Sequence, residues 1–252
     1  MPEPSKRRWD RRTRILLAIS AVLVVSGLVH LVVFVLDDRP WAGPVSWRKP
    51  FTFGVSFGVT LASVVWVTSY LRLTERVRTL LLGIFAADCI VEVAGITLQA
   101  WRDVPSHLNR STPANTAVAV TLAIGGAVLI VVLGWFALIA VRGRIDATPS
   151  MRLALRAGFL LLVAGLLAGA VMIGVGTVAM NTGTAAHAYA VTGFLKGFHA
   201  VTLHAVLALP ALAWLLARLP WPEPRRLAVT RAAVALYAVA ALAALVFDLA
   251  TA

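Results

Sequence analysis

Cysteine and charged residues are both scarce in this 252-residue sequence. The single cysteine, Cys89, lies inside an apolar run, which excludes a disulfide framework and the CxxC and CxxCH patterns of zinc and haem attachment sites. Only 13% of the residues are charged and 60% are hydrophobic, whereas soluble domains average about 25% charged and about 45–50% apolar residues. These proportions indicate a protein that buries much of its apolar surface in lipid.

The sequence motifs of nucleotide-binding and hydrolytic enzymes are also missing. There is no P-loop, no HExxH and no GxSxG sequence. Residues 174–179 match GxGxxA, but they lie inside a long apolar stretch with no strand before them, so a dinucleotide-binding turn is not expected there.

Seven apolar stretches are long enough to cross a membrane, since a bilayer core needs about 20 apolar residues per helix. We therefore predict an all-α, polytopic fold: a single seven-helix bundle over residues 15–250, preceded by a basic tail at 1–14. The first stretch is too long for a signal peptide and has no small-residue cleavage pattern, so we interpret it as a signal anchor. Pro210 is expected to kink the sixth helix toward its cytoplasmic end. The predicted spans are residues 15–36, 51–71, 79–100, 116–141, 153–180, 189–217 and 228–250.

The basic residues predict the orientation of this bundle. Seventeen of the 23 Lys and Arg residues lie in the tail and in alternate connections, and five lie on the opposite side. The positive-inside rule then puts the N-terminus in the cytoplasm and the C-terminus outside. The net charge of +12 is therefore mainly topological, and its expected partner is the anionic inner leaflet rather than nucleic acid. Abundant Arg, Ala and Val suggest a bacterial source, and hence a bacterial plasma membrane.

Several ionisable side chains fall inside the spans, where a charge costs roughly 2.5–3.5 kcal/mol and usually marks a functional site. Asp88, Glu92 and Gln99 form one stripe on the third helix. At about 1.5 Å per residue, Glu92 and His204 both lie near mid-membrane. We therefore expect an outward-opening polar cavity between the first, third and sixth helices.

We assign these side chains and their neighbours in the outer loops to three roles. The candidate catalytic or proton-carrying groups are Asp88, Glu92 and Lys196. The candidate metal or haem ligands are His30, His199 and His204, although the last two point about 140° apart on one helix. The candidate binding residues are Arg48, Lys49, Gln99, Arg102, His107 and Asn109.

Three segments carry a resemblance to a known group of proteins. They are SWRKP at 46–50, QAWR with PSHLN over 99–109, and HAVTLHA at 199–205. Together they resemble a family of uncharacterised bacterial multi-helix membrane proteins, over roughly residues 40–210. The resemblance implies no reaction. It implies that six residues belong to motifs shared with that family, namely Lys49, Gln99, His107, Asn109, His199 and His204.

Three functions are compatible with these residues. The first is a metal or haem site for redox or metal-assisted chemistry, with the histidines as ligands. The second is a proton-coupled small-molecule transporter, in which Asp88, Glu92 and His204 relay protons, although the sequence shows no internal repeat of the kind common in transporters. The third is a metal-free intramembrane enzyme, resembling a cyclase or hydrolase, acting on a lipid-soluble substrate. A purely structural pairing of Glu92 with Lys196 or a histidine is the plainer alternative.

Overall fold

The computed structural model describes residues 10–252, and these residues form an all-α structure. Apart from an isolated bridge between Leu71 and Ile145, no β pairing occurs in this range. The predicted tail falls mostly on residues 1–9, outside the described residues, and Arg11 already opens the first helix. The helices are α1 (Arg11–Leu36), α2 (Arg48–Thr68), α3 (Glu75–Trp101), α4 (Pro113–Arg142), α5 (Pro149–Thr182), α6 (Ala185–Val191), α7 (Lys196–Leu203), α8 (Ala205–Leu216) and α9 (Glu223–Ala250).

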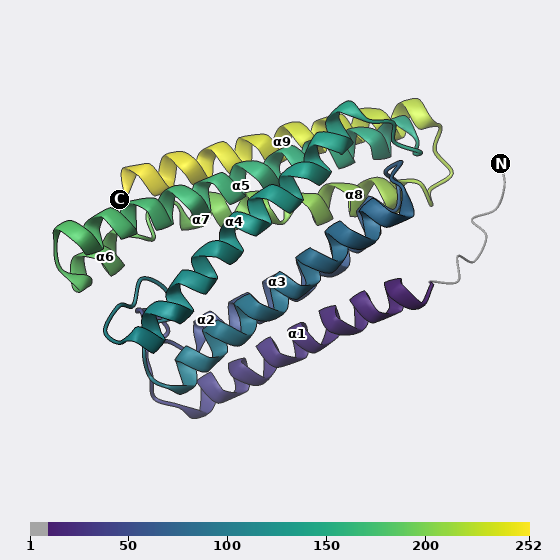
Figure 1. The fold of residues 1–252 in the computed structure, drawn as a ribbon. Helices are drawn as coiled ribbons and strands as arrows, with labels where there is room; N and C mark the ends of the chain where they lie inside the picture. Colours follow the sequence, from purple (N-terminus) through teal and green to yellow (C-terminus); the bar gives the residue numbers. More distant parts are fainter. Residues whose placement is uncertain (1–9) are drawn as a thin grey trace.

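Seven helical segments in the described range are long and apolar enough to cross a membrane, which confirms the predicted number. The sixth of them consists of α7 and α8 together. The long helices run along one another, and α1 begins at the end of the bundle opposite to that where α9 finishes (Figure 1). We call the end that holds residues 37–47, 102–112 and 183–195 the loop-rich end. The other end, with residues 69–74, 143–148 and 217–222, is the arginine-rich end.

Polar caps fix where most of the helices begin. In each case a side-chain oxygen accepts a hydrogen bond from the backbone N–H three residues later, which satisfies a donor that the helix leaves unpaired. The four capped spanning helices begin three or four residues before the predicted spans, because the capped first turn is polar and the prediction followed apolar residues. The capping residues are Asp10, Thr74, Thr112, Thr148 and Thr184.

The predicted sixth span, 189–217, is divided into three pieces. Its first residues belong to the short helix α6, the spanning part starts only at Lys196, and the helix breaks at His204. The Thr202 hydroxyl donates to the Phe198 carbonyl oxygen at 2.7 Å, a back-bond that bends helices. Pro210 supplies no N–H to the turn before it. An interruption therefore lies at mid-span, on the N-terminal side of Pro210, and the kink expected at Pro210 itself stays a prediction.

Glycines allow α1 and α2 to touch closely. A β-carbon at Gly54 would lie 2.7 Å from the Gly27 Cα, so only a hydrogen fits between the two backbones. One turn further along α2, the Ser20 hydroxyl donates to the Gly58 carbonyl. Close backbone contact of this kind stabilises helix pairs in lipid, where no hydrophobic force brings helices together.

The main apolar core and most of the buried His, Asn and Gln side chains lie in different halves of the bundle, although several Ser and Thr hydroxyls are also buried near the arginine-rich end. Helix α5 is central and contacts α4, α7, α8 and α9. The main apolar core, with Phe85, Phe136 and Phe159 fully buried, lies in the half next to the arginine-rich end. The half next to the loop-rich end instead buries polar side chains, so candidate functional groups collect there. These are His30, Ser46, Gln99, Ser106, Asn109 and Asn115.

Replacing Gly54 by Ala should destabilise the protein by about 1–3 kcal/mol, because the added methyl group forces α1 and α2 apart. The matched control is Gly174→Ala, at an exposed helical position with open space around it. There the same change should be neutral or stabilising by up to about 1 kcal/mol. Circular dichroism during SDS-driven unfolding measures both, and a loss of the same size in the two variants contradicts the close-contact explanation.

Candidate functional site

His30 is enclosed by two tryptophans at the loop-rich end, and is only 5% exposed. The Trp101 indole N–H donates to His30 Nε2 at 3.1 Å, and His30 Nδ1 lies 2.7 Å from the Ser26 carbonyl oxygen. Because an indole N–H can only donate, Nε2 accepts and Nδ1 carries the proton. The ring also stacks on Trp47 at 5.9 Å. Both ring nitrogens are thus engaged, so His30 offers no free ligand atom.

Trp47 links this cluster to charged side chains of the loop at residues 37–47. Its indole N–H donates to Asp37 Oδ2 at 2.8 Å, and the Arg39 guanidinium lies 4.5 Å above its ring centroid. Arg39 also pairs with Asp37 at 3.4 Å and with Asp103 at 3.1 Å. The Trp47 hydrogen bond, followed by Arg39, holds the pKa of Asp37 below its usual range. Arg39 therefore neutralises both of these loop carboxylates.

Gln99 starts a chain of hydrogen bonds that joins α3 to α4. It accepts from Arg102 Nη1 at 2.7 Å and donates to Asn115 Oδ1 at 3.1 Å. Asn115 donates to the Ser111 hydroxyl at 2.9 Å, which in turn donates to Asn109 Oδ1 at 2.8 Å. Three of the predicted binding residues, Gln99, Arg102 and Asn109, thus lie together. Their bonds to one another hold the loop at 102–112 in position.

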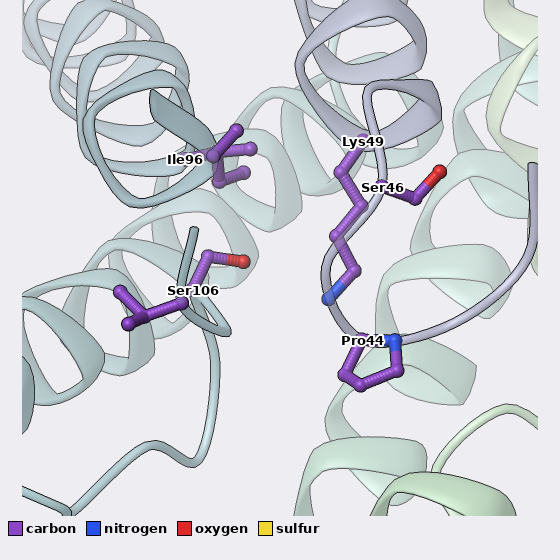
Figure 2. A pocket seen from close by; sticks show the side chains of 7 residues that line it. Pro44, Ser46, Lys49, Ile96 and Ser106 are labelled. Carbon is purple, nitrogen blue, oxygen red and sulfur yellow. The ribbon is translucent and has the colours of Figure 1, made fainter. Parts of the chain in front are cut away.

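Lys49 lines a small cavity between the loop at residues 37–47 and the loop at residues 102–112. The cavity has a volume of about 10 Å³, roughly the space that one water molecule needs. Figure 2 shows the Lys49 side chain reaching past Ser46 toward Pro44, with Ser106 and Ile96 on the opposite wall. Within residues 10–252, the Lys49 ammonium group has no hydrogen bond or ion pair.

Two further cations lie near Lys49. Arg48 precedes it in α2, and Lys196, at the start of α7, is close enough to interact electrostatically with both. None of the three forms an ion pair with a carboxylate in the described part of the chain. Asp248 instead accepts the Phe198 backbone N–H at 2.7 Å. We call Arg48, Lys49 and Lys196 the cation group. Its uncompensated charge attracts anions.

His107 lies beside this group in a loop with unusual backbone geometry. Leu108, the next residue, has a φ of 60°, a left-handed conformation that costs energy for a non-glycine residue. The His107 ring contacts Phe53 at 5.9 Å between centroids, and its Nδ1 lies 2.9 Å from Ser106 Oγ. Burial, together with the charge of Lys49, lowers the pKa of His107 to about 4. The imidazole is therefore neutral near pH 7 and adds no charge to the cation group.

Asp88 and Glu92 lie side by side in the middle of α3, as their spacing predicts. Both are buried, and both face Gly125 of α4. A β-carbon at Gly125 would lie 2.8 Å from Asp88 Oδ1 and closer still to Glu92 Oε1, so the glycine makes room for the two carboxyl groups. Among the described residues no cation pairs with either one, and Asp88 Oδ2 has no hydrogen-bond partner. Glu92 and Lys196 thus do not form the structural ion pair that the sequence allowed.

The remaining histidines do not converge on the carboxyl groups. His199 Nδ1 lies 2.7 Å from the Gly165 carbonyl oxygen of α5, and His204 is exposed on the surface of the bundle. The carboxyl groups face α4 and therefore do not line one cavity with the histidines of the first and sixth helices. Over residues 10–252, no three His, Cys, Asp or Glu side chains are arranged to hold a metal ion. Metal or haem binding stays a prediction without a ligand cluster.

Sequence reasoning missed several residues that shape this site. Gly125 had no signal, because its role depends on which helix faces the carboxyl groups. Asp248 had one: it is an acidic residue inside an apolar stretch, the same feature that identified Asp88. Trp47 is 1% exposed and is part of the buried network. Asn115 lies in the first turn of α4, just after its Thr-Pro cap.

No protein-family model, curated protein or solved structure matches this chain. The resemblance to an uncharacterised membrane-protein family stays a prediction. Two of its motif segments nevertheless meet in space, because SWRKP and PSHLN contribute Ser46, Lys49 and Ser106 to one cavity. The adjoining QAWR segment contributes Ala100 to the same wall.

The partly buried, neutral His107 should make stability depend on pH. Below its ordinary pKa of 6.5, the unfolded chain binds a proton that folded His107 does not accept until about pH 4. Stability should therefore fall as the pH drops from 6.5 to 4, and His107→Asn should remove part of that slope. Melting temperatures in detergent between pH 4 and 7 measure this. The control His187→Asn, at an exposed position of α6, should keep the wild-type slope. A His107→Asn slope equal to wild type contradicts the prediction.

Proposed function

We propose that this protein is a proton-coupled transporter of a small anion in a bacterial plasma membrane. The proposal rests on two sets of ionisable side chains that lack partners of opposite sign and lie in different parts of the bundle. The cation group lies at the loop-rich end, and the Asp88–Glu92 pair lies in the middle of α3. Of the three functions that the sequence allowed, proton-coupled transport makes use of both groups.

The cation group supplies the first step, which is binding of the anion. Lys49 lines a cavity, has no carboxylate partner, and stands near Arg48 and Lys196. Placing three positive charges together is unfavourable unless a negative charge joins them. The cavity in this conformation has space for about one water molecule, so a larger anion requires the loops at 37–47 and 102–112 to separate.

The carboxyl pair supplies the coupling to protons. Two ionised carboxylates one turn apart repel each other, and they would also repel an anion moving past them. Proton binding at Asp88 or Glu92 removes that repulsion, so an anion passes more easily when a proton is present. The two ligands then favour each other, which is the thermodynamic requirement for coupled movement.

The sixth span has a feature that many transporters use for conformational change. A one-residue turn at His204 interrupts it between α7 and α8, with the His204 backbone still in the αR region. Many transporters place their binding sites beside interrupted helices near mid-membrane. Because Lys196 opens α7, a movement at this break would carry one member of the cation group with it.

We also infer that the arginine-rich end faces the cytoplasm, with the C-terminus outside. The described residues at that end include fourteen arginines, whereas the opposite end has far fewer cations. Cytoplasmic connections carry such an excess of basic residues, and the anionic inner leaflet would attract them.

Single-cysteine labelling tests this orientation. Because Cys89 is fully buried, a Cys89→Ala background should remain folded and unreactive. In intact cells, a membrane-impermeant maleimide should label Ala252→Cys at the loop-rich end. It should label Glu75→Cys, at the exposed start of α3, only after the cells are permeabilised. The reverse pattern would show that the inferred orientation is wrong.

Flux into proteoliposomes tests the proposed transport. Vesicles loaded with a pH-sensitive dye are given labelled phosphate, sulfate or succinate under an inward proton gradient. At least one of these anions should enter together with protons. Lys49→Met should reduce anion uptake about tenfold or more, because it removes the charge that holds the anion. The double variant Asp88→Asn, Glu92→Gln should remove the dependence of uptake on the proton gradient while anion binding remains.

The control variant is Arg110→Gln, a cation of the same end whose guanidinium donates to Asn181. Its uptake and coupling should match wild type. The proposal would be overturned by proteoliposomes that take up none of the three anions. Uptake that ignores the proton gradient in wild type, or gradient-driven uptake that persists in the double variant Asp88→Asn, Glu92→Gln, would overturn it equally.

A further inference from the structure

A cavity at the arginine-rich end is lined mainly by arginines. It has a volume of about 310 Å³, at the lower end of the range of about 300–1,000 Å³ for small-ligand pockets. It lies between the connection from α2 to α3 and the start of α5. Its lining residues are Arg72, Gly143, Arg144, Ile145, Asp146, Arg152 and Arg156.

The floor of this cavity is held in place by backbone contacts between two connections. Leu71 and Ile145 form an antiparallel bridge, and both side chains are buried. The Asp146 amide N–H donates to the Tyr70 carbonyl at 3.0 Å. These bonds fix the spacing between Arg72 and the arginines of the other connection, so the cavity does not depend on mobile side chains alone.

Four arginines face a single acid in this cavity. Arg72 pairs with Asp146 at 2.8 Å through its Nε atom alone. Arg152 and Arg156 each use one nitrogen to hold a backbone carbonyl. Each guanidinium has five N–H donors, so most of the donors in the cavity have no protein acceptor. Arginine forks of this kind match the oxygens of a phosphate group.

The surface next to the cavity is apolar. Val141 on α4 and Leu160 on α5 are 38% and 56% exposed, and both lie within about one turn of the arginines. A ligand with a phosphate head and hydrocarbon chains therefore finds both kinds of surface side by side. Basic pockets of this type between spanning helices bind anionic lipid headgroups.

We propose that this cavity binds a phosphate ester, supplied by an anionic phospholipid of the adjoining leaflet. The site is separate from the cation group and does not depend on transport. A bound lipid here would bridge α4, α5 and the α2–α3 connection, and would stabilise the arginine-rich end of the bundle.

Native mass spectrometry of the detergent-purified protein tests this, with phosphatidylglycerol as the anionic probe and phosphatidylcholine, which is zwitterionic with no net charge, as the comparison. The triple variant Arg72→Gln, Arg144→Gln, Arg156→Gln should bind phosphatidylglycerol about tenfold more weakly than wild type. The matched control is Arg11→Gln, Arg76→Gln, Arg231→Gln. It removes three exposed arginines from the same end but outside the cavity, and should bind as wild type does.

Two further measurements distinguish binding of the lipid at this cavity from misfolding of the variant and from binding of free phosphate. Arg144→Glu removes no side-chain hydrogen bond within residues 10–252, so it should weaken binding even if the triple variant folds poorly. Inorganic phosphate and glycerol 3-phosphate are tested as competitors. If they bind at the cavity and phosphatidylglycerol does not, the lipid source is overturned. An equal loss of phosphatidylglycerol in the cavity and control triples overturns the site itself, because only general surface charge would then attract the lipid.

Discussion

The free-energy cost of removing polar and charged groups from water determines where the side chains of this protein lie. In a membrane every backbone group has to be paired within its own helix, which accounts for seven long helices and very little other structure. Buried side chains obey the same requirement. His30 and Gln99 meet it through partners on neighbouring elements. Lys49 and the Asp88–Glu92 pair, whose charges lack a partner of opposite sign, depart from it, which makes them the strongest functional candidates.

Small residues connect the packing of the bundle to the chemistry of the site. Gly27 and Gly54 bring α1 against α2, which carries Lys49 at its first turn. Gly125 leaves room on α4 for two carboxyl groups, and Gly165 lets α7 approach α5 closely enough for His199 to reach a carbonyl. In each case the absence of a side chain on one helix gives a polar group on another helix its place.

The two ends of the bundle treat positive charge differently. At the loop-rich end, Arg39 forms ion pairs with Asp37 and Asp103. Neither carboxylate therefore pairs with the cation group. There the cavity beside Lys49 is small, and Lys196 is exposed. At the arginine-rich end the cavity is larger and lies beside exposed apolar side chains, an arrangement suited to a lipid headgroup. The arginine excess at one end thus supports the lipid proposal, whereas the cation group at the other end supports the transport proposal.

Hydropathy and charge determined the number of spans and the end of the bundle that carries the arginines. The helical period determined that Asp88 and Glu92 share one face. These follow from the chain alone, because the length of an apolar run and the helical period are local properties. Only the tertiary structure decided that the carboxyl groups face Gly125, that His30 lies between tryptophans, and that His204 is exposed. The helical period gives the angle between residues on one helix, but not how that helix is rotated against its neighbours. That rotation depends on glycine contacts and loop hydrogen bonds between residues far apart in the chain, which no local pattern contains.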